Sequence, residues 1–216
     1  MRPLSHILDV IDRLVNNYFK LFMSNGIGMA RPREFDEVRV REALMNEFWE
    51  KGYKATSMQD LVDATGLLKG SLYGAFGGKQ ALYMIALAHY DQTRIQAGID
   101  MLTGEGSAGE KITRLFDTVI DAAKAGVFAG GCLLCNASVE MAPVDTAVEN
   151  SVKSIIRRFQ AAVRTAIETT VKPSVDAAAL SGFIICAYFG ARVLAKAGAP
   201  LQMIVDTREQ CLKDLN

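Results

Sequence analysis

Residues 56–83, TSMQDLVDATGLLKGSLYGAFGGKQALY, contain two short helical patterns separated by one glycine. Ser57, followed three residues later by Asp60, is typical of a capped helix start. Gly66 supplies the turn, and the pair Gly77-Gly78 ends the second helix before a third begins. Two helices held at a fixed angle by a short turn form a helix-turn-helix, which can place its second helix in a DNA major groove.

The charge balance does not by itself indicate a nucleic-acid partner. The 216 residues include 24 Lys and Arg against 24 Asp and Glu, so the formal net charge is zero. A strongly basic chain would have favoured DNA by electrostatic attraction alone. Any DNA interaction must therefore depend on where individual charges and small side chains lie.

The second helix of this unit carries side chains suited to a DNA groove. Lys69, Gly70 and Ser71 combine a charge, a bare backbone and a hydroxyl, which fit base edges. Helix starts and nearby hydroxyls are suited to phosphates. An ordinary helical hairpin with solvated lysines is the alternative interpretation. The candidate DNA-binding residues are Thr56, Ser57, Leu68, Lys69, Gly70, Ser71, Tyr73 and Lys79.

Helical spacing of apolar residues continues from Phe35 to the end of the chain, and no alternating strand pattern occurs. We predict an all-α protein with a three-helix helix-turn-helix domain over residues 29–78 and a larger helical domain over residues 79–216. Asp145 is expected to cap a long helix. The apolar stretch Ala177–Ala191 is shorter than the ~18 residues of a membrane span, so we expect a buried helix and no membrane partner.

Residues 1–28 form a separate pattern, in which Ile7, Ile11, Leu14 and Tyr18 fall on one helical face. We interpret them as an N-terminal extension that need not belong to the native protein, because Met29 is an alternative start. The other interpretation is an amphipathic arm that packs on its own dimer or on a partner. The mixed charges of its polar face argue against a membrane-surface helix.

The segment GYKATSMQDLVDATGLLKGSLYGAFGGKQALY resembles the N-terminal domain of the tetracycline-repressor (TetR) family of transcriptional regulators. The resemblance runs from about Arg31 to Tyr90. It includes the A-T-G turn and the sequence K-G-S-L-Y in the second helix of the helix-turn-helix, which is the helix that would read the DNA. It implies that Lys69, Gly70 and Ser71 lie in the groove and that the phosphate contacts come from Thr56, Ser57, Tyr73 and Lys79. Family members usually have a small polar residue where this chain has Leu68. We therefore expect Thr65 to cap this helix, or its start to fray until DNA binds.

The same resemblance implies that the C-terminal region forms a homodimer and encloses a pocket for a small, apolar ligand. Filling the pocket would move the helix that begins at Lys79 and separate two reading heads on a palindromic operator. We selected candidate pocket residues as large side chains on apolar helix faces: Phe116, Val119, Ile120, Met141, Phe159, Val163, Ile184 and Tyr188.

Cys132 and Cys135 form the second group with possible chemistry. A G-C-L segment ahead of a short helix and Glu140 resembles a subgroup that includes oxidant- and electrophile-sensing regulators. A helix N-terminus lowers a thiol pKa, so Cys132 is the candidate reactive thiol and Cys135 its resolving partner. Joining them within one helical turn is awkward unless the turn opens. The alternative is that both are small core hydrophobes.

Other chemistries of a C-x-x-C pair lack support in the sequence. A thioredoxin-like site needs a βαβ context, and a zinc site needs two further ligands. We therefore predict no metal and no cofactor. The expected function is a cytoplasmic, ligand-responsive transcriptional repressor that is not an enzyme. The alternatives are a redox- or electrophile-sensing repressor that uses Cys132, an enzyme, and a DNA-independent interaction protein.

Overall fold

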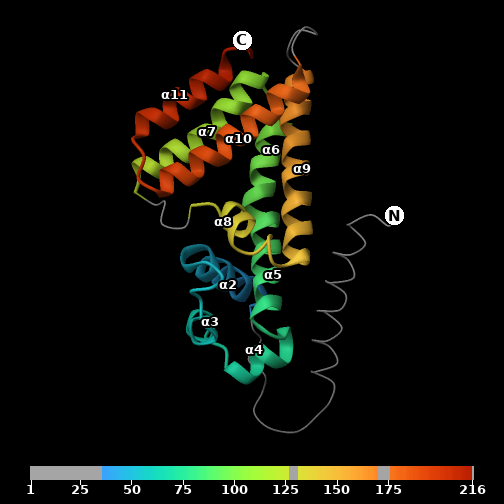
Figure 1. The fold of residues 1–216 in the computed structure, drawn as a ribbon, viewed down its shortest axis with the longest axis vertical. Helices are drawn as coiled ribbons and strands as arrows, with labels where there is room; N and C mark the ends of the chain where they lie inside the picture. The colour runs from blue at the N-terminus through green and yellow to red at the C-terminus, as the bar shows by residue number, and fades with distance from the viewer. Residues whose placement is uncertain (1–35, 127–130, 170–175, 216) are drawn as a thin grey trace, which may run out of the picture.

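A computed structural model describes residues 36–126, 131–169 and 176–215. Within these ranges the chain is helical and contains no strand, which confirms the predicted all-α class. Figure 1 shows short helices at one end, longer helices at the other, and a long rod that joins them. The helix predicted within residues 1–28 lies outside the described residues.

Three helices make up one end of the molecule, residues 37–76, which we call the reading head. Leu44, Met45 and Phe48 lie on the inner side of the first helix and are fully buried. The first helix packs on the second, and the second packs on the third. The helices are α2 (Glu37–Lys51), α3 (Met58–Thr65) and α4 (Lys69–Phe76).

Five further helices follow later in the chain: α7 (Ala108–Lys124), α8 (Leu133–Glu140), α9 (Thr146–Glu168), α10 (Ala177–Lys196) and α11 (Leu201–Leu212). Asp145 caps α9 as predicted, because its carboxylate accepts the N–H groups of Ala147 and Val148 at 2.9 and 3.1 Å. We call α7, α9, α10 and α11 the body. The short α8 lies at the waist between body and reading head (Figure 1).

The rod consists of α5 (Lys79–Tyr90), a π-helical stretch η1 (Asp91–Ile95) and α6 (Gln96–Thr103). Arg158 of α9 forms an ion pair with Asp91 in the π-helical stretch. On α6, a Cβ at Gly98 would lie 2.9 Å from the ring of Phe159. The close approach of α6 to α9 therefore requires a glycine, and it fixes the rod against the body.

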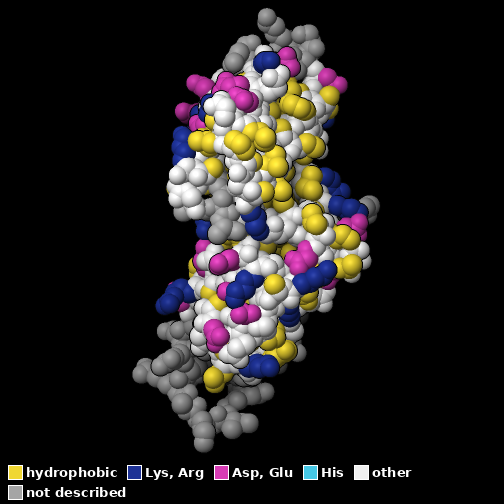
Figure 2. All heavy atoms as spheres, turned by 60° about the vertical axis from the view of Figure 1, so that its left-hand side comes forward, with side chains coloured by type: hydrophobic (Ala, Val, Ile, Leu, Met, Phe, Trp, Pro, Cys, Tyr) yellow, Lys and Arg dark blue, Asp and Glu magenta, His cyan; other side chains and the backbone are white. Residues whose placement is uncertain are grey.

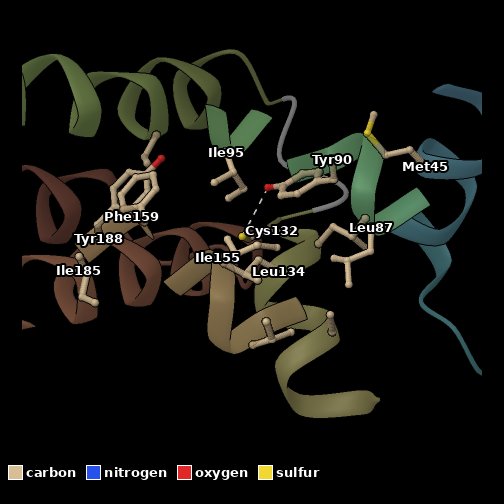
Figure 3. Close-up of a cluster of buried hydrophobic side chains, with 14 of the residues drawn as sticks. Met45, Leu87, Tyr90, Ile95, Cys132, Leu134, Ile155, Phe159, Ile185 and Tyr188 are labelled. Atoms are coloured by element: carbon tan, nitrogen blue, oxygen red, sulfur yellow. Dashed lines mark hydrogen bonds between the residues drawn. The ribbon is translucent and has the colours of Figure 1, made fainter. Parts of the chain in front are cut away.

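One hydrophobic core extends from the reading head into the body. Figure 3 shows Met45 and Leu87 on one side, Cys132 in the middle, and Phe159 and Tyr188 on the other. Because protein interiors are close-packed, a displacement of one of these elements must be taken up by its neighbours.

Candidate DNA interface and thiol site

The outer face of α4 is bare. Gly70 and Gly74 lie one turn apart, and a Cβ built on either meets nothing within 4 Å. Neither glycine has a positive φ. A glycine inside a helix destabilises it by ~0.5–1 kcal/mol relative to alanine. Since neither packing nor backbone geometry requires glycine here, the two positions are suited to the close approach of an external partner.

The side chains around these glycines suit a nucleic acid. Leu68 and Tyr73 are 77% and 46% exposed, and Lys69 is also exposed. Ser71 is half-buried, while Leu72 points inward and is fully buried. The structure therefore places an ammonium group and a phenolic hydroxyl beside a bare stretch of backbone.

The predicted capping box at the start of α3 is present. Ser57 Oγ accepts the Asp60 N–H at 3.1 Å, and the Asp60 carboxylate accepts the Ser57 N–H at 2.6 Å. Lys51 Nζ donates to the same carboxylate at 2.7 Å. The hydrogen bonds from Lys51 and Ser57 hold the pKa of Asp60 well below its usual range. The start of α3 is thus fixed, with Ser57 exposed at the surface.

Two residues predicted to contact phosphates, Thr56 and Lys79, both contact the turn after α2. Thr56 is 1% exposed and its hydroxyl donates to the Gly52 carbonyl at 2.6 Å. The Thr56 hydroxyl therefore fixes the turn after α2, and the phosphate contact expected from Thr56 stays a prediction. Lys79 Nζ lies 4.5 Å from the centre of the Tyr53 ring and donates to the Lys54 carbonyl at 3.4 Å. Lys79 therefore rests on that same turn.

The start of α4 has no side-chain cap. Leu68 occupies the N-cap position and makes no capping hydrogen bond. The Thr65 hydroxyl accepts the Leu67 N–H at 3.3 Å and donates to the Leu61 carbonyl at 2.6 Å. The expectation that Thr65 caps α4 is therefore wrong, because its hydroxyl is used within the turn. The first amides of α4 are left to water or to an outside acceptor such as a phosphate.

All eight predicted pocket residues are buried. Phe116 and Phe159 each pack on Tyr188, with ring centroids 5.6 Å apart in both pairs. These three rings form one contacting cluster. The other five residues belong to the same core: Val119, Ile120, Met141, Val163 and Ile184.

Cys132 occupies the N-cap position of α8 with extended backbone, φ −130° and ψ 116°. Its backbone is therefore not helical, although its carbonyl accepts the Asn136 N–H at 3.0 Å and closes the first turn of α8. The Tyr90 hydroxyl donates to Cys132 Sγ at 3.5 Å (Figure 3). The Cys135 thiol, the Arg192 guanidinium and the Tyr90 hydroxyl lower the Cys132 pKa, although burial opposes the shift. The hydrogen bond to Cys132 and burial raise the pKa of Cys135.

Arg192 is the member of this group that sequence reasoning missed. Its guanidinium donates to the hydroxyls of Tyr188 and Tyr90 at 3.0 and 3.4 Å and to the Gly131 carbonyl at 3.3 Å. Its Nε is buried without a partner among the described residues. Arg192 is half-buried, a cation withdrawn from water favours a compensating anion, and none of these oxygens carries a full charge. The available sequence signal was a lone arginine at the end of an apolar stretch.

The outer face of α10 is apolar. Phe183, Val193 and Leu194 are 52%, 48% and 45% exposed. Figure 2 shows hydrophobic side chains gathered over the body. By length and composition alone α10 is also long and apolar enough to cross a membrane. Of its apolar stretch, 28% is buried inside the chain. The expectation of a buried helix therefore holds for one face, that of Ile184 and Tyr188, and not for the other.

Comparison with known proteins places these features in a family. Residues 40–84 match the family described as bacterial regulatory proteins, tetR family, and residues 108–207 match the tetracyclin repressor-like C-terminal domain. The uncharacterized HTH-type transcriptional regulator YezE of Bacillus subtilis (strain 168) is 32% identical over 117 residues, which are 54% of this chain and 60% of YezE. The HTH-type transcriptional repressor ComR of Escherichia coli (strain K12) is 26% identical over 183 residues, covering 81% of this chain and 86% of ComR.

A solved structure is similar over nearly the whole described fold. It is a cysteine mutant of the TetR family transcriptional regulator CifR, complexed with 26bp double-strand operator DNA. The two chains are 30% identical with a TM-score of 0.73, covering 86% of this chain and 100% of the other. The present chain therefore belongs to the TetR family of transcriptional regulators.

Proposed function

We propose that this protein is a transcriptional repressor that binds a palindromic operator as a homodimer and is released by a small molecule. The observation that carries the proposal is the outer face of α4, where Gly70 and Gly74 face open space. The operator complex of CifR and the repressor ComR support it. DNA binding belongs to residues 29–78, ligand binding and dimerisation to residues 79–216, and the protein acts in the cytoplasm.

The reading head contacts both the bases and the phosphate backbone of the DNA. Lys69, Gly70 and Ser71 approach base edges in the major groove. Ser57, Tyr73 and Lys79 contact phosphates on either side, as do the uncapped amides of α4. Phosphate contacts fix the register of the head on DNA, and base contacts select the sequence.

The homodimer is formed by the apolar outer face of α10 together with α9. Phe183, Val193 and Leu194 are exposed in the single chain, and α9 packs beside α10. A second copy would bury these side chains by twofold symmetry. Two reading heads would then meet half-sites ~34–36 Å apart, about one turn of DNA.

A small, apolar ligand enters between the rings of Phe116, Phe159 and Tyr188. Because the rings are in contact, a ligand there displaces Tyr188, whose hydroxyl accepts from Arg192. The displacement reaches the rod through Tyr90, which shares Arg192. The ligand weakens operator binding only to the extent that it prefers the displaced conformation, typically by ~1–3 kcal/mol.

The direct test is a titration of purified protein onto DNA from immediately upstream of its own gene. Scrambled DNA of equal length is the control, and both are measured across a salt series with reductant present. Tight, sequence-dependent binding by a dimer is expected, with log K falling by about 0.9 per phosphate contact for each tenfold rise in salt. Weak binding that is equal on both DNAs and disappears with salt would contradict the proposal.

The position of Arg192 favours a second signal that releases the repressor, namely oxidation at the thiol site. Among the described residues its polar partners are two phenols and a carbonyl, and the sulfur of Cys132 lies beside the same Tyr90 hydroxyl. A Cys132 thiolate supplies the missing negative charge and is also the nucleophilic form of the residue. The repressor would then sense peroxides through Cys132.

The oxidation proceeds in two steps. The Cys132 thiolate attacks one oxygen of hydrogen peroxide, the O–O bond breaks, and the hydroxide released takes a proton to become water. The Cys135 thiol then attacks the sulfur of the Cys132 sulfenic acid, an S–S bond forms and a second water leaves. Two thiols have lost two electrons and two protons, and the peroxide has been reduced to two waters.

Intact-mass analysis after treatment with hydrogen peroxide tests this input. A loss of two hydrogens that maps to Cys132 and Cys135, together with release from the operator, is the expected result. Cys132→Ser should abolish both changes. Cys186→Ser is the control, because Cys186 is an exposed thiol on α10. Unchanged release in the Cys132→Ser protein would exclude this input.

A further inference from the structure

Glu140, the last residue of α8, links that helix directly to the reading head. Its carboxylate accepts the backbone N–H of Tyr53 at 2.8 Å and that of Lys54 at 2.6 Å. Both amides belong to the turn that follows α2. Hydrogen bonds to a carboxylate are short and strong because the acceptor is charged. One side chain therefore fixes two consecutive residues that lie 87 and 86 positions away in the chain.

The stability of α8 does not explain a glutamate at this position. A negative charge at a helix C-terminus is unfavourable, because the helix dipole is negative there. The turn, in contrast, is shaped around the carboxylate. Gly52 has φ 82°, and a Cβ at that position would lie 3.0 Å from Glu140 Oε2. The glycine allows both the left-handed backbone and the close approach of the carboxylate.

The turn held by Glu140 also carries the groups proposed to contact DNA. Lys79 rests on it, with Nζ over the Tyr53 ring and bonded to the Lys54 carbonyl. Thr56 bonds back to the Gly52 carbonyl and directly precedes Ser57, the N-cap of α3. A movement of the turn therefore moves Lys79 and the start of α3 together.

The opposite end of α8 is the thiol site. Cys132 is the N-cap of this eight-residue helix, and Glu140 is its last residue. Midway along the helix, Asn136 Nδ2 donates to the Trp49 carbonyl of α2 at 3.4 Å. A single short helix thus spans the distance from Cys132 and its neighbour Arg192 to the turn after α2.

We propose that Glu140 is the positioning residue that couples the thiol and ligand end of α8 to the DNA-contacting surface. The proposal rests on the function proposed above for that surface. Oxidation of Cys132 removes the charge opposite Arg192 and shifts α8, and Glu140 then releases Tyr53 and Lys54. Lys79 and Ser57 lose their alignment, and the head loses affinity for the operator.

Amide hydrogen exchange at Tyr53 and Lys54, with and without hydrogen peroxide, tests the link without any DNA. In the wild type we expect oxidation to accelerate exchange at both amides about 10-fold. Glu140→Gln keeps the side-chain shape but presents an amide N–H₂ to one of the two donors. Its exchange should be fast before oxidation and should change less than about 2-fold on oxidation.

Glu149→Gln is the matched control, because Glu149 is a partly exposed acid on α9 that pairs with Lys153. It should behave as the wild type. A merely structural role for Glu140 would lower the melting temperature of Glu140→Gln but leave the oxidation-dependent change intact. That outcome, or no change at Tyr53 and Lys54 in the oxidised wild type, would overturn the proposal.

Operator affinity measured on the same samples separates this proposal from the function on which it rests. Oxidation should weaken operator binding about 10-fold in the wild type, and by less than about 2-fold in Glu140→Gln. If the wild type never binds operator DNA, the proposed function fails, and the exchange data still decide whether Glu140 couples the two ends of α8.

Discussion

The helices α4 and α10 both leave an outer face uncovered, and the two faces are built from opposite kinds of residue. On α4 the face is two glycines flanked by Lys69 and Tyr73, whereas on α10 it is led by Phe183 and Val193. Apart from Leu68, the first face offers little apolar area to bury, and it favours a polar partner that comes close to the backbone. Leaving the second face in water, rather than burying it, costs ~25 cal/mol per Å² of apolar surface. We therefore propose that the first face binds nucleic acid and the second binds another copy of the chain.

A charge on the α10 face should have the largest effect. Phe183→Glu places a carboxylate where two apolar faces would meet, so we expect monomers and a loss of operator affinity of more than about 100-fold, or ~2.7 kcal/mol. Sedimentation analysis and DNA titration measure the two effects. Val144→Glu, at an exposed valine outside α10, should change neither. If Phe183→Glu stays a dimer and still binds DNA, the outer face of α10 does not form the dimer interface.

Removal of one charge from the α4 face should have the next largest effect. Lys69→Ala should weaken operator binding about 10-fold or more if Lys69 reads a base, and should relax the preference at that base. Lys124→Ala on α7 removes another exposed charge far from the head and should have no effect. An unchanged affinity for Lys69→Ala would mean that the bare face of α4 does not enter the groove.

The thiol site allows a test by pH. The folded-state pKa of Cys132 is lowered, so its stabilising contribution is present above the ordinary thiol pKa and is lost as pH falls through the folded value. The unfolding free energy of the wild type relative to Cys132→Ser should therefore rise with pH as pH approaches about 8.5 and level off above it. Urea unfolding at a series of pH values measures this difference. A difference that falls as pH rises would show that the thiol is buried in its neutral form.

The smallest expected effects are those of two capping serines, and they distinguish a loss of helix capping from a loss of DNA contact. Ser57 and Ser107 form the same capping box, the first on α3 and the second on α7. Replacing either with alanine should lower stability by about 1 kcal/mol. Ser57→Ala should also weaken operator binding a few-fold, because its exposed hydroxyl lies on the face proposed to contact DNA, whereas Ser107→Ala should not. Equal operator affinity in the two variants would remove Ser57 from the interface.

The features that could be predicted from the sequence are local. Ser57, Gly66 and Asp145 determine helix ends through backbone groups within three or four residues, and all three have the predicted roles. Helical periodicity likewise identified the all-α class. These signals depend on chain geometry alone and do not require knowledge of how the helices pack.

The features that could not be predicted join distant segments. Glu140 of α8 accepts hydrogen bonds from Tyr53 and Lys54, and Arg192 of α10 donates to Tyr90 of α5. Each contact depends on how two helices pack, which no local pattern specifies. Thr56 is buried, which its place at a helix start does not reveal. Polar side chains that bridge helices are therefore the part of the candidate site that required the structure.

The most direct test of the account is Gly70→Ala, with stability and operator affinity measured on the same protein. A Cβ at Gly70 meets nothing within the chain, and alanine is the better helix former. We predict a fold that is more stable by about 0.5–1 kcal/mol and operator binding that is about 10-fold weaker, because the methyl group keeps the backbone from the bases. A variant that is equally or more stable and binds the operator as tightly as the wild type would contradict the claim that this face reads DNA.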